Sequence, residues 1–82
     1  MSATRNYMVI LKPDPDGGFV VNVPALLEVS TQGETEVEAL ANAREAIELA
    51  IEVRLADGDH VPGGQETQIR QVSVNLPAPS TV

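Results

Sequence analysis

Hydrophobic residues in the first third of the chain fall into short runs, the pattern of strands rather than of a helix. A continuous apolar run over residues 7–11 predicts a strand that is covered on both faces. Residues 19–23 predict a second strand, with Phe19, Val21 and Val23 on one face and Val20 and Asn22 on the other. Two prolines and two glycines lie between the runs, at residues 13–18, and they favour a turn. Together these segments predict an antiparallel hairpin.

A third and more polar strand is predicted over residues 27–31, after Pro24 ends the second one. Its alternation places Leu27 and Val29 toward the core and the polar residues between them toward solvent. An outward face of this kind suits the edge of a sheet.

The clearest local signal in the sequence is the start of a helix. Thr35 and Glu38 have the spacing of a capping box, and Gly58 suits the position just after a helix, so we predict a helix from about residue 36 to residue 57. Larger side chains recur at three- and four-residue intervals on one side of it: Val37, Leu40, Arg44, Ile47, Ile51 and Leu55. Beside them runs a stripe of small residues that would let the helix lie close to a sheet: Ala39, Ala43, Ala46 and Ala50.

A last strand is predicted from Thr67 to Leu76, where apolar Val72, Val74 and Leu76 alternate with polar residues and Ile69 is out of phase. The fold class is therefore α+β, in the order β-β-β-α-β, with one mostly antiparallel sheet backed by one helix. With 82 residues the chain forms a single domain, which we expect to have a structured core over residues 6–76 and a flexible tail over residues 77–82.

Charge and composition exclude several functions. Five Lys and Arg against twelve Asp and Glu give a net charge of −7, the wrong sign for holding nucleic acid and the right sign for a basic protein partner. The absence of cysteine excludes disulfides, thiolate zinc sites and cysteine nucleophiles. Charges or prolines interrupt every apolar run before it reaches the roughly 18 residues of a membrane span. Residues 1–6 lack the apolar core of a signal peptide, so we expect a cytoplasmic protein.

Two groups of residues could carry chemistry. Asp14 and Asp16 could hold a divalent cation as nuclease carboxylates do, but two aspartates in a Pro-Asp-Gly-Gly turn are better explained as caps of their own backbone. His60 with Asp57 and Asp59 could bind a metal or act as a base, yet a lone histidine after a helix end is more typical of a solvated loop. We therefore predict no catalytic, metal or cofactor site.

Several motifs, taken in order, resemble the N-terminal domain of the HicB family, the antitoxins of HicA/HicB toxin–antitoxin pairs. The matching segments are Tyr7–Leu11, Pro13–Phe19, Val23-Pro24, Thr31-Gln32-Gly33-Glu34-Thr35, Glu38-Ala39-Leu40 and Ala43–Ile47. The resemblance covers roughly residues 7–76. It implies a partial ribonuclease-H-like fold of three strands, one helix and a last strand.

The sequence departs from the family pattern in three places. Leu27-Glu28-Val29-Ser30 stands where family members usually carry a Gly-Cys step, and aliphatic residues around Leu49 and Ala50 replace an aromatic residue in the helix. Many HicB proteins continue into a C-terminal helix-turn-helix or ribbon-helix-helix domain, whereas this sequence ends shortly after Leu76-Pro77. We therefore do not expect operator binding or autoregulation to carry over.

The leading hypothesis is a non-enzymatic binding module that resembles a HicB-type antitoxin and blocks a small, basic, HicA-like ribonuclease toxin. The candidate partner-binding residues are all acidic: Asp14, Asp16, Glu45, Glu48 and Glu52. On base rates an ordinary solvated helix face is the commoner explanation of the three glutamates, and the family resemblance narrows that difference. The alternative function is a stand-alone homo-oligomeric domain with an unrelated protein or ligand partner, and a metal-dependent nuclease using the two aspartates is a third.

A homodimer is also expected. One helix covers only one face of a sheet, which leaves apolar residues on the other face in need of cover. The candidate self-association residues are Met8, Ile10, Val20 and Ile69.

Overall fold

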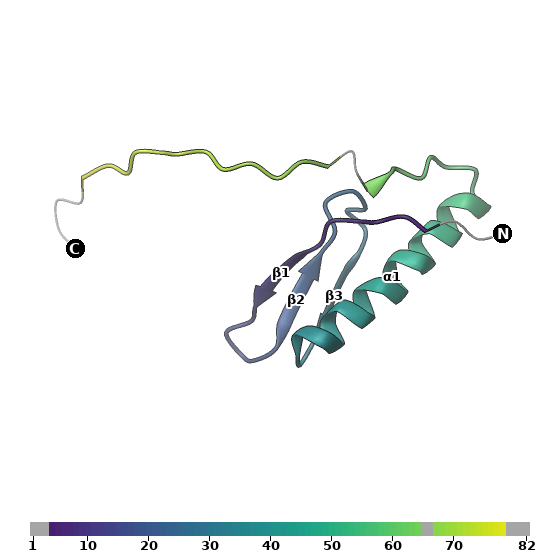
Figure 1. The fold of residues 1–82 in the computed structure, drawn as a ribbon, viewed down its shortest axis with the longest axis horizontal. Coiled ribbons are helices and arrows are strands. Elements are labelled where there is room, and N and C mark those ends of the chain that lie inside the picture. The colour runs from purple at the N-terminus through teal and green to yellow at the C-terminus, as the bar shows by residue number, and fades with distance from the viewer. Residues whose placement is uncertain (1–3, 65–66, 79–82) are drawn as a thin grey trace.

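The computed structural model describes residues 4–64 and 67–78. Three strands, β1 (Ile10–Pro13), β2 (Phe19–Asn22) and β3 (Ser30–Gly33), form an antiparallel sheet in the order β1-β2-β3. One long helix, α1 (Glu36–Ala56), follows and lies across one face of this sheet (Figure 1). The structure thus confirms an α+β fold with an antiparallel sheet backed by one helix.

The β1–β2 hairpin is confirmed, although β1 begins three residues later than the apolar run suggests. Leu11 pairs with Val21, which in turn pairs with Thr31, so these positions share the sheet face that looks toward α1. The connecting turn is closed by a hydrogen bond from the Asp14 N–H to the Gly18 carbonyl, at 2.9 Å. Gly18 has a φ of 79°, a conformation that residues with a Cβ rarely adopt.

The third strand starts later than predicted, at Ser30, and the inward position predicted for Leu27 is wrong. Two turns precede β3 and bring every third residue into the core, as shown by the buried Val23, Leu26 and Val29. Their N–H groups bond back to carbonyls three residues earlier, Leu26 to Val23 at 3.1 Å and Val29 to Leu26 at 2.9 Å. Leu27 is 87% exposed as a result, while the inward prediction for Val29 is confirmed.

The helix boundaries follow the predicted caps. The Glu38 N–H donates to the Thr35 hydroxyl at 3.1 Å, and the Glu38 carboxylate accepts from the N–H of Glu34, also at 3.1 Å. In a standard capping box the Glu38 carboxylate would accept from the N–H of Thr35, the N-cap residue. Here it accepts from the N–H of Glu34, one residue earlier. At the other end the helix finishes at Ala56, and Gly58 takes the left-handed conformation with a φ of 74°.

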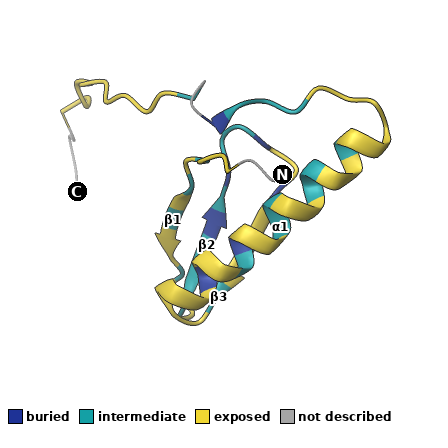
Figure 2. Cartoon of the chain, turned by 45° about the vertical axis from the view of Figure 1, so that its right-hand side comes forward, coloured by how far each residue is buried: buried dark blue, intermediate teal, exposed yellow. Residues whose placement is uncertain are grey.

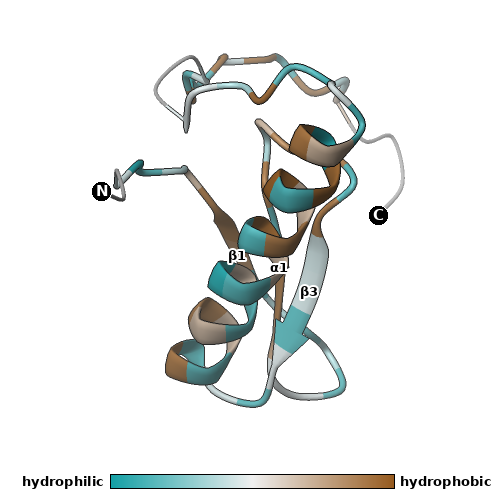
Figure 3. Cartoon of the chain, turned by 90° about the vertical axis from the view of Figure 1, so that its right-hand side faces the viewer, coloured by the Kyte–Doolittle hydropathy of each residue, from teal (hydrophilic) through white to brown (hydrophobic). Residues whose placement is uncertain are grey.

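The stripe of small residues, rather than that of larger ones, faces the sheet. Ala39 and Ala43 are buried against Val21, and α1 packs mainly on β3 and less on β2. A Cβ on Gly33 would collide with the backbone of Ala39, so the missing side chain allows this close approach. The larger aliphatic stripe lies along the flank of the helix, where Leu40 remains 41% exposed. In Figure 2 exposed positions of α1 alternate mostly with half-buried ones, and the buried positions lie near its start. Apolar residues recur along the helix in Figure 3.

The predicted last strand does not join the sheet. Residues 67–78, here called the C-terminal arm, form no strand and extend away from the sheet and helix (Figure 1). Val72, Val74 and Leu76 are 82%, 73% and 83% exposed. The strand lacks a partner because the arm does not run alongside a free edge of its own sheet. Of the predicted flexible tail, residues 79–82 lie outside the described part of the chain.

Candidate protein-binding surfaces

The aspartate turn between β1 and β2 is held together by its own side chain. The Asp14 carboxylate accepts the N–H of Asp16 at 2.8 Å, and the Asp14 carbonyl accepts the N–H of Gly17 at 2.9 Å. This is the backbone capping that the turn interpretation predicts. Within residues 4–64 and 67–78, no three His, Cys, Asp or Glu side chains are placed to hold a metal ion.

A small polar recess of about 460 Å³ adjoins this turn. Asp14 lines it together with Glu34 and Glu38 from the start of α1, and Asn42 closes one side by donating to the Gln32 carbonyl at 2.8 Å. Sequence reasoning did not associate the two glutamates with the turn, because they lie about 20 residues away and serve as helix-capping residues. The acidic character of this end of the molecule is therefore greater than Asp14 and Asp16 alone indicate.

The three predicted helix glutamates, Glu45, Glu48 and Glu52, are all exposed on α1. Among the described residues, only Glu48 of the three forms an ion pair, with Arg44, whose Nε lies 3.8 Å from a carboxylate oxygen, and both side chains are well exposed. Such a pair is too solvated to neutralise the surface. None of these glutamates lines the recess beside Asp14, so the predicted acidic residues form two surfaces rather than one.

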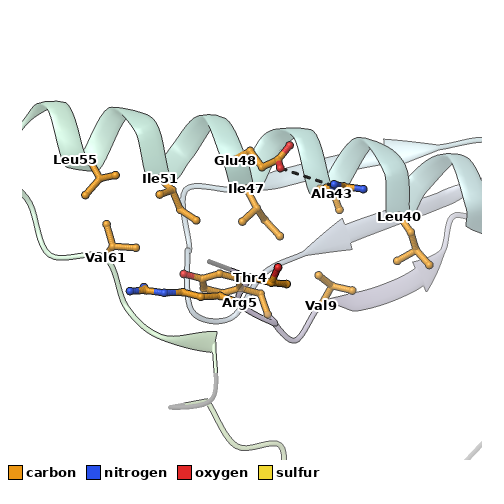
Figure 4. A pocket seen from close by; sticks show the side chains of 12 residues that line it. Thr4, Arg5, Val9, Leu40, Ala43, Ile47, Glu48, Ile51, Leu55 and Val61 are labelled. Carbon is orange, nitrogen blue, oxygen red and sulfur yellow. Dashed lines mark ion pairs between the residues drawn. The ribbon is translucent and has the colours of Figure 1, made fainter. Parts of the chain in front are cut away.

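An open, mainly apolar groove of about 890 Å³ runs along the flank of α1. Leu40, Ile47, Ile51 and Leu55 project into it from the helix, as Figure 4 shows. The opposite wall comes from the segment leading into β1 and from the loop after α1, and includes Tyr7, Val9 and Val61. The larger stripe of α1 therefore faces an unfilled groove.

An ion pair ties the end of α1 to the turns before β3. The Arg54 guanidinium donates to both carboxylate oxygens of Glu28, at 2.7 and 2.8 Å, and to the backbone carbonyl of His60 at 2.9 Å. The hydrogen bonds from Arg54 lower the pKa of Glu28 from its ordinary 4.5 to about 2, and the same bonds raise the pKa of Arg54. His60 is exposed and takes part through its backbone, as expected of a loop residue.

Two of the four predicted self-association residues, Ile10 and Val20, share one sheet face, and Met8 lies two residues before β1. Ile10 pairs with Asn22 and Lys12 with Val20, and these positions alternate with the ones that face α1. Met8 and Ile10 are 48% and 37% exposed, and Val20 is half-buried. The fourth residue, Ile69, lies on the C-terminal arm and is not brought to this face.

The fold and the motif order can be compared with known families. Residues 6–82 match the family described as the HicB-like antitoxin of bacterial toxin–antitoxin systems. The chain belongs to the HicB-like antitoxin family. Its relatives include a UPF0150 protein of Thermoplasma acidophilum, 44% identical over 77% of this chain and 91% of that protein. A UPF0150 protein of Synechocystis is also 44% identical, over 70% of this chain and 72% of its own length.

The relatives of this HicB-like protein also include proteins named antitoxin HicB. Antitoxin HicB of Escherichia coli K12 is 38% identical over 68% of this chain, and the match spans 41% of that antitoxin. Family membership implies an antitoxin role in a toxin–antitoxin system. In the described part of the chain, no helix is long and apolar enough to cross a membrane.

Proposed function

We propose that this HicB-like protein is a non-enzymatic antitoxin that acts in the cytoplasm by binding a small, basic, HicA-like ribonuclease and blocking its active site. The observation that carries the proposal is the family match over residues 6–82, which includes the whole sheet and helix. A net charge of −7 complements a basic toxin and speeds the encounter between the two proteins.

The exposed glutamates of α1 provide the first candidate contact surface. Glu45, Glu48 and Glu52 lie within two turns of the helix and point into solvent, so they can approach a basic active site without rearrangement of the fold. Asp14 and Asp16, with the adjoining recess, provide the second. The acidic side chains would compete with RNA phosphates for the same basic groups of the toxin.

A binding measurement with matched variants tests this surface. The partner to be tested is a HicA-like protein, sought first in the reading frame beside this gene. The double variant Glu45→Gln/Glu52→Gln removes two charges without touching the groove. Asp57→Asn/Asp59→Asn removes two charges beyond the helix end and serves as the control. We expect the helix variant to slow association by about tenfold at low salt and the control to change it less than about twofold. Wild-type protein that binds no such partner would contradict the proposal.

We also propose that the protein is a homodimer. The exposed Met8 and Ile10, with Val20, supply one candidate contact face on the sheet, and exposed apolar residues on the arm supply another. The alternative function, a homo-oligomeric domain with an unrelated partner, would be favoured if a dimer forms but the basic neighbour does not bind.

A further inference from the structure

The sheet has two unpaired edges within the described residues, one along β1 and one along β3, and the β1 side adjoins the groove. Within the described residues, β1 pairs with β2 along one side only, so backbone N–H and C=O groups on its other side have no strand partner. The helix packs mainly on β3 and less on β2, and the β1 side of the inner face is only partly covered, with Leu11 half-buried. The groove between α1 and the approach to β1 lies at this position, with Val9 on one wall and Ile47 on the other. A strand added beside β1 would fill the groove and complete the sheet.

The C-terminal arm has the properties of that missing strand. Val72, Val74 and Leu76 fall on one side of it and are more than 70% exposed, while Gln71, Ser73 and Asn75 fall on the other. A single extended segment in water gains neither hydrogen bonds nor burial to offset the entropy of ordering it. The arm therefore requires a partner.

The root of the arm is fixed beside the groove. Gly64 is buried, and a Cβ there would collide with the backbone of Asn6, so the chain passes directly against the segment that leads into β1. The Tyr7 hydroxyl donates to the Pro62 carbonyl at 2.7 Å and joins the same two segments. Beyond this contact, the arm extends away from the sheet and α1 (Figure 1). The radius of gyration is 16.6 Å, against about 12 Å for a compact chain of this length.

We propose that two copies of the chain exchange arms. Residues 67–78 of each copy lie along the open edge of β1 in the other, with Val72, Val74 and Leu76 facing the groove below Leu40, Ile47 and Ile51. The occupant of the groove is a second copy, because every chain carries one arm and one groove. A two-fold exchange fills both grooves and leaves neither arm exposed. The arm spans about 40 Å at roughly 3.3 Å per residue, enough to cross a body whose shorter dimensions are 28 and 20 Å.

This inference rests on the homodimer proposed above but not on toxin binding, so all its tests use the full chain alone. The first compares two triple variants of equal charge by light scattering over a dilution series. Val72→Asp/Val74→Asp/Leu76→Asp alters the apolar side of the arm, and Gln71→Asp/Ser73→Asp/Asn75→Asp alters the polar side. We expect the first to weaken dimerisation by at least ~100-fold and the second by less than ~10-fold. Equal masses for the two variants would overturn the exchange.

A cross-linking test separates exchange between copies from closure within one chain. Because the sequence contains no cysteine, tagged Val74→Cys protein can be refolded with untagged Ile51→Cys protein and then oxidised. Val72→Cys and Leu76→Cys extend the test to neighbouring registers, and Asn75→Cys is the control on the opposite side. We expect a tagged–untagged disulfide dimer from at least one apolar position and little from the control. A disulfide that forms only inside the double variant Ile51→Cys/Val74→Cys, leaving a monomer, would overturn the proposal.

The outer sheet face is the competing interface. Ile10→Glu leaves both arm and groove intact, so arm exchange predicts that this variant stays dimeric. If Ile10→Glu were monomeric while Val72→Asp/Val74→Asp/Leu76→Asp stayed dimeric, the interface would lie on the outer sheet face and arm exchange would be wrong.

Discussion

Leu26 gives the sharpest test of how the chain enters β3. Its side chain is fully buried with Val23 and Val29 and contacts the helix through the cluster that includes Ala46 and Ile47. Leu26→Ala removes buried methyl groups and leaves a cavity, which costs about 3 kcal/mol within the usual 2–5 kcal/mol range. An 82-residue domain has a total stability of roughly 4–12 kcal/mol, so this one substitution removes a large share of it.

Leu27→Ala is the matched control, because the same substitution is made one residue later at a side chain that is 87% exposed. We expect it to change the free energy of unfolding by less than about 0.5 kcal/mol. Urea unfolding followed by circular dichroism, at one fixed protein concentration, measures both effects. With a slope near 1 kcal/mol per molar, Leu26→Ala should lower the midpoint by about 3 M. If Leu27→Ala lowered the free energy of unfolding more than Leu26→Ala does, the two turns before β3 would be wrong. The simple strand alternation, with Leu27 inward, would then hold.

Three further predictions follow from individual contacts. Because Glu28 has a pKa lowered to about 2, its ion pair with Arg54 stabilises the fold above about pH 4.5 and loses that effect as pH falls toward 2. The midpoint difference between wild type and Glu28→Gln should shrink over that range. Gly64→Ala should destabilise the protein by about 1–3 kcal/mol in urea unfolding, since its Cβ meets backbone. Incubation with Mg²⁺ or Mn²⁺ should give no RNA cleavage, and cleavage abolished by Asp14→Asn/Asp16→Asn would contradict the turn interpretation.

The parts of the fold that the sequence predicts well are those set by local chemistry. The Thr35–Glu38 cap, Gly58 at the helix end and the glycine turn at residues 17–18 depend on neighbours within a few positions, and all are found where expected. Leu27 was misplaced because two consecutive turns give a period of three that strand alternation does not anticipate.

The candidate surfaces were less predictable because they depend on packing. The periodicity of α1 shows two apolar stripes but not which one meets the sheet. The choice was decided by Gly33, which lets the backbone of Ala39 approach β3 and leaves Leu40 on the flank. The groove exists for that reason. The segment from Thr67 to Leu76 has the alternation of a strand, but alternation does not identify the chain that supplies its partner.

The most direct test of the central claim is rescue of growth. If the reading frame beside this gene encodes a small basic HicA-like protein, cells that express that protein should stop growing. Induction of this HicB-like protein should then restore growth and yield a complex of the two on purification. We expect Asp57→Asn/Asp59→Asn to rescue fully and Glu45→Gln/Glu52→Gln to rescue less well. Cells that stay arrested while the wild-type protein accumulates in folded form would contradict the antitoxin function.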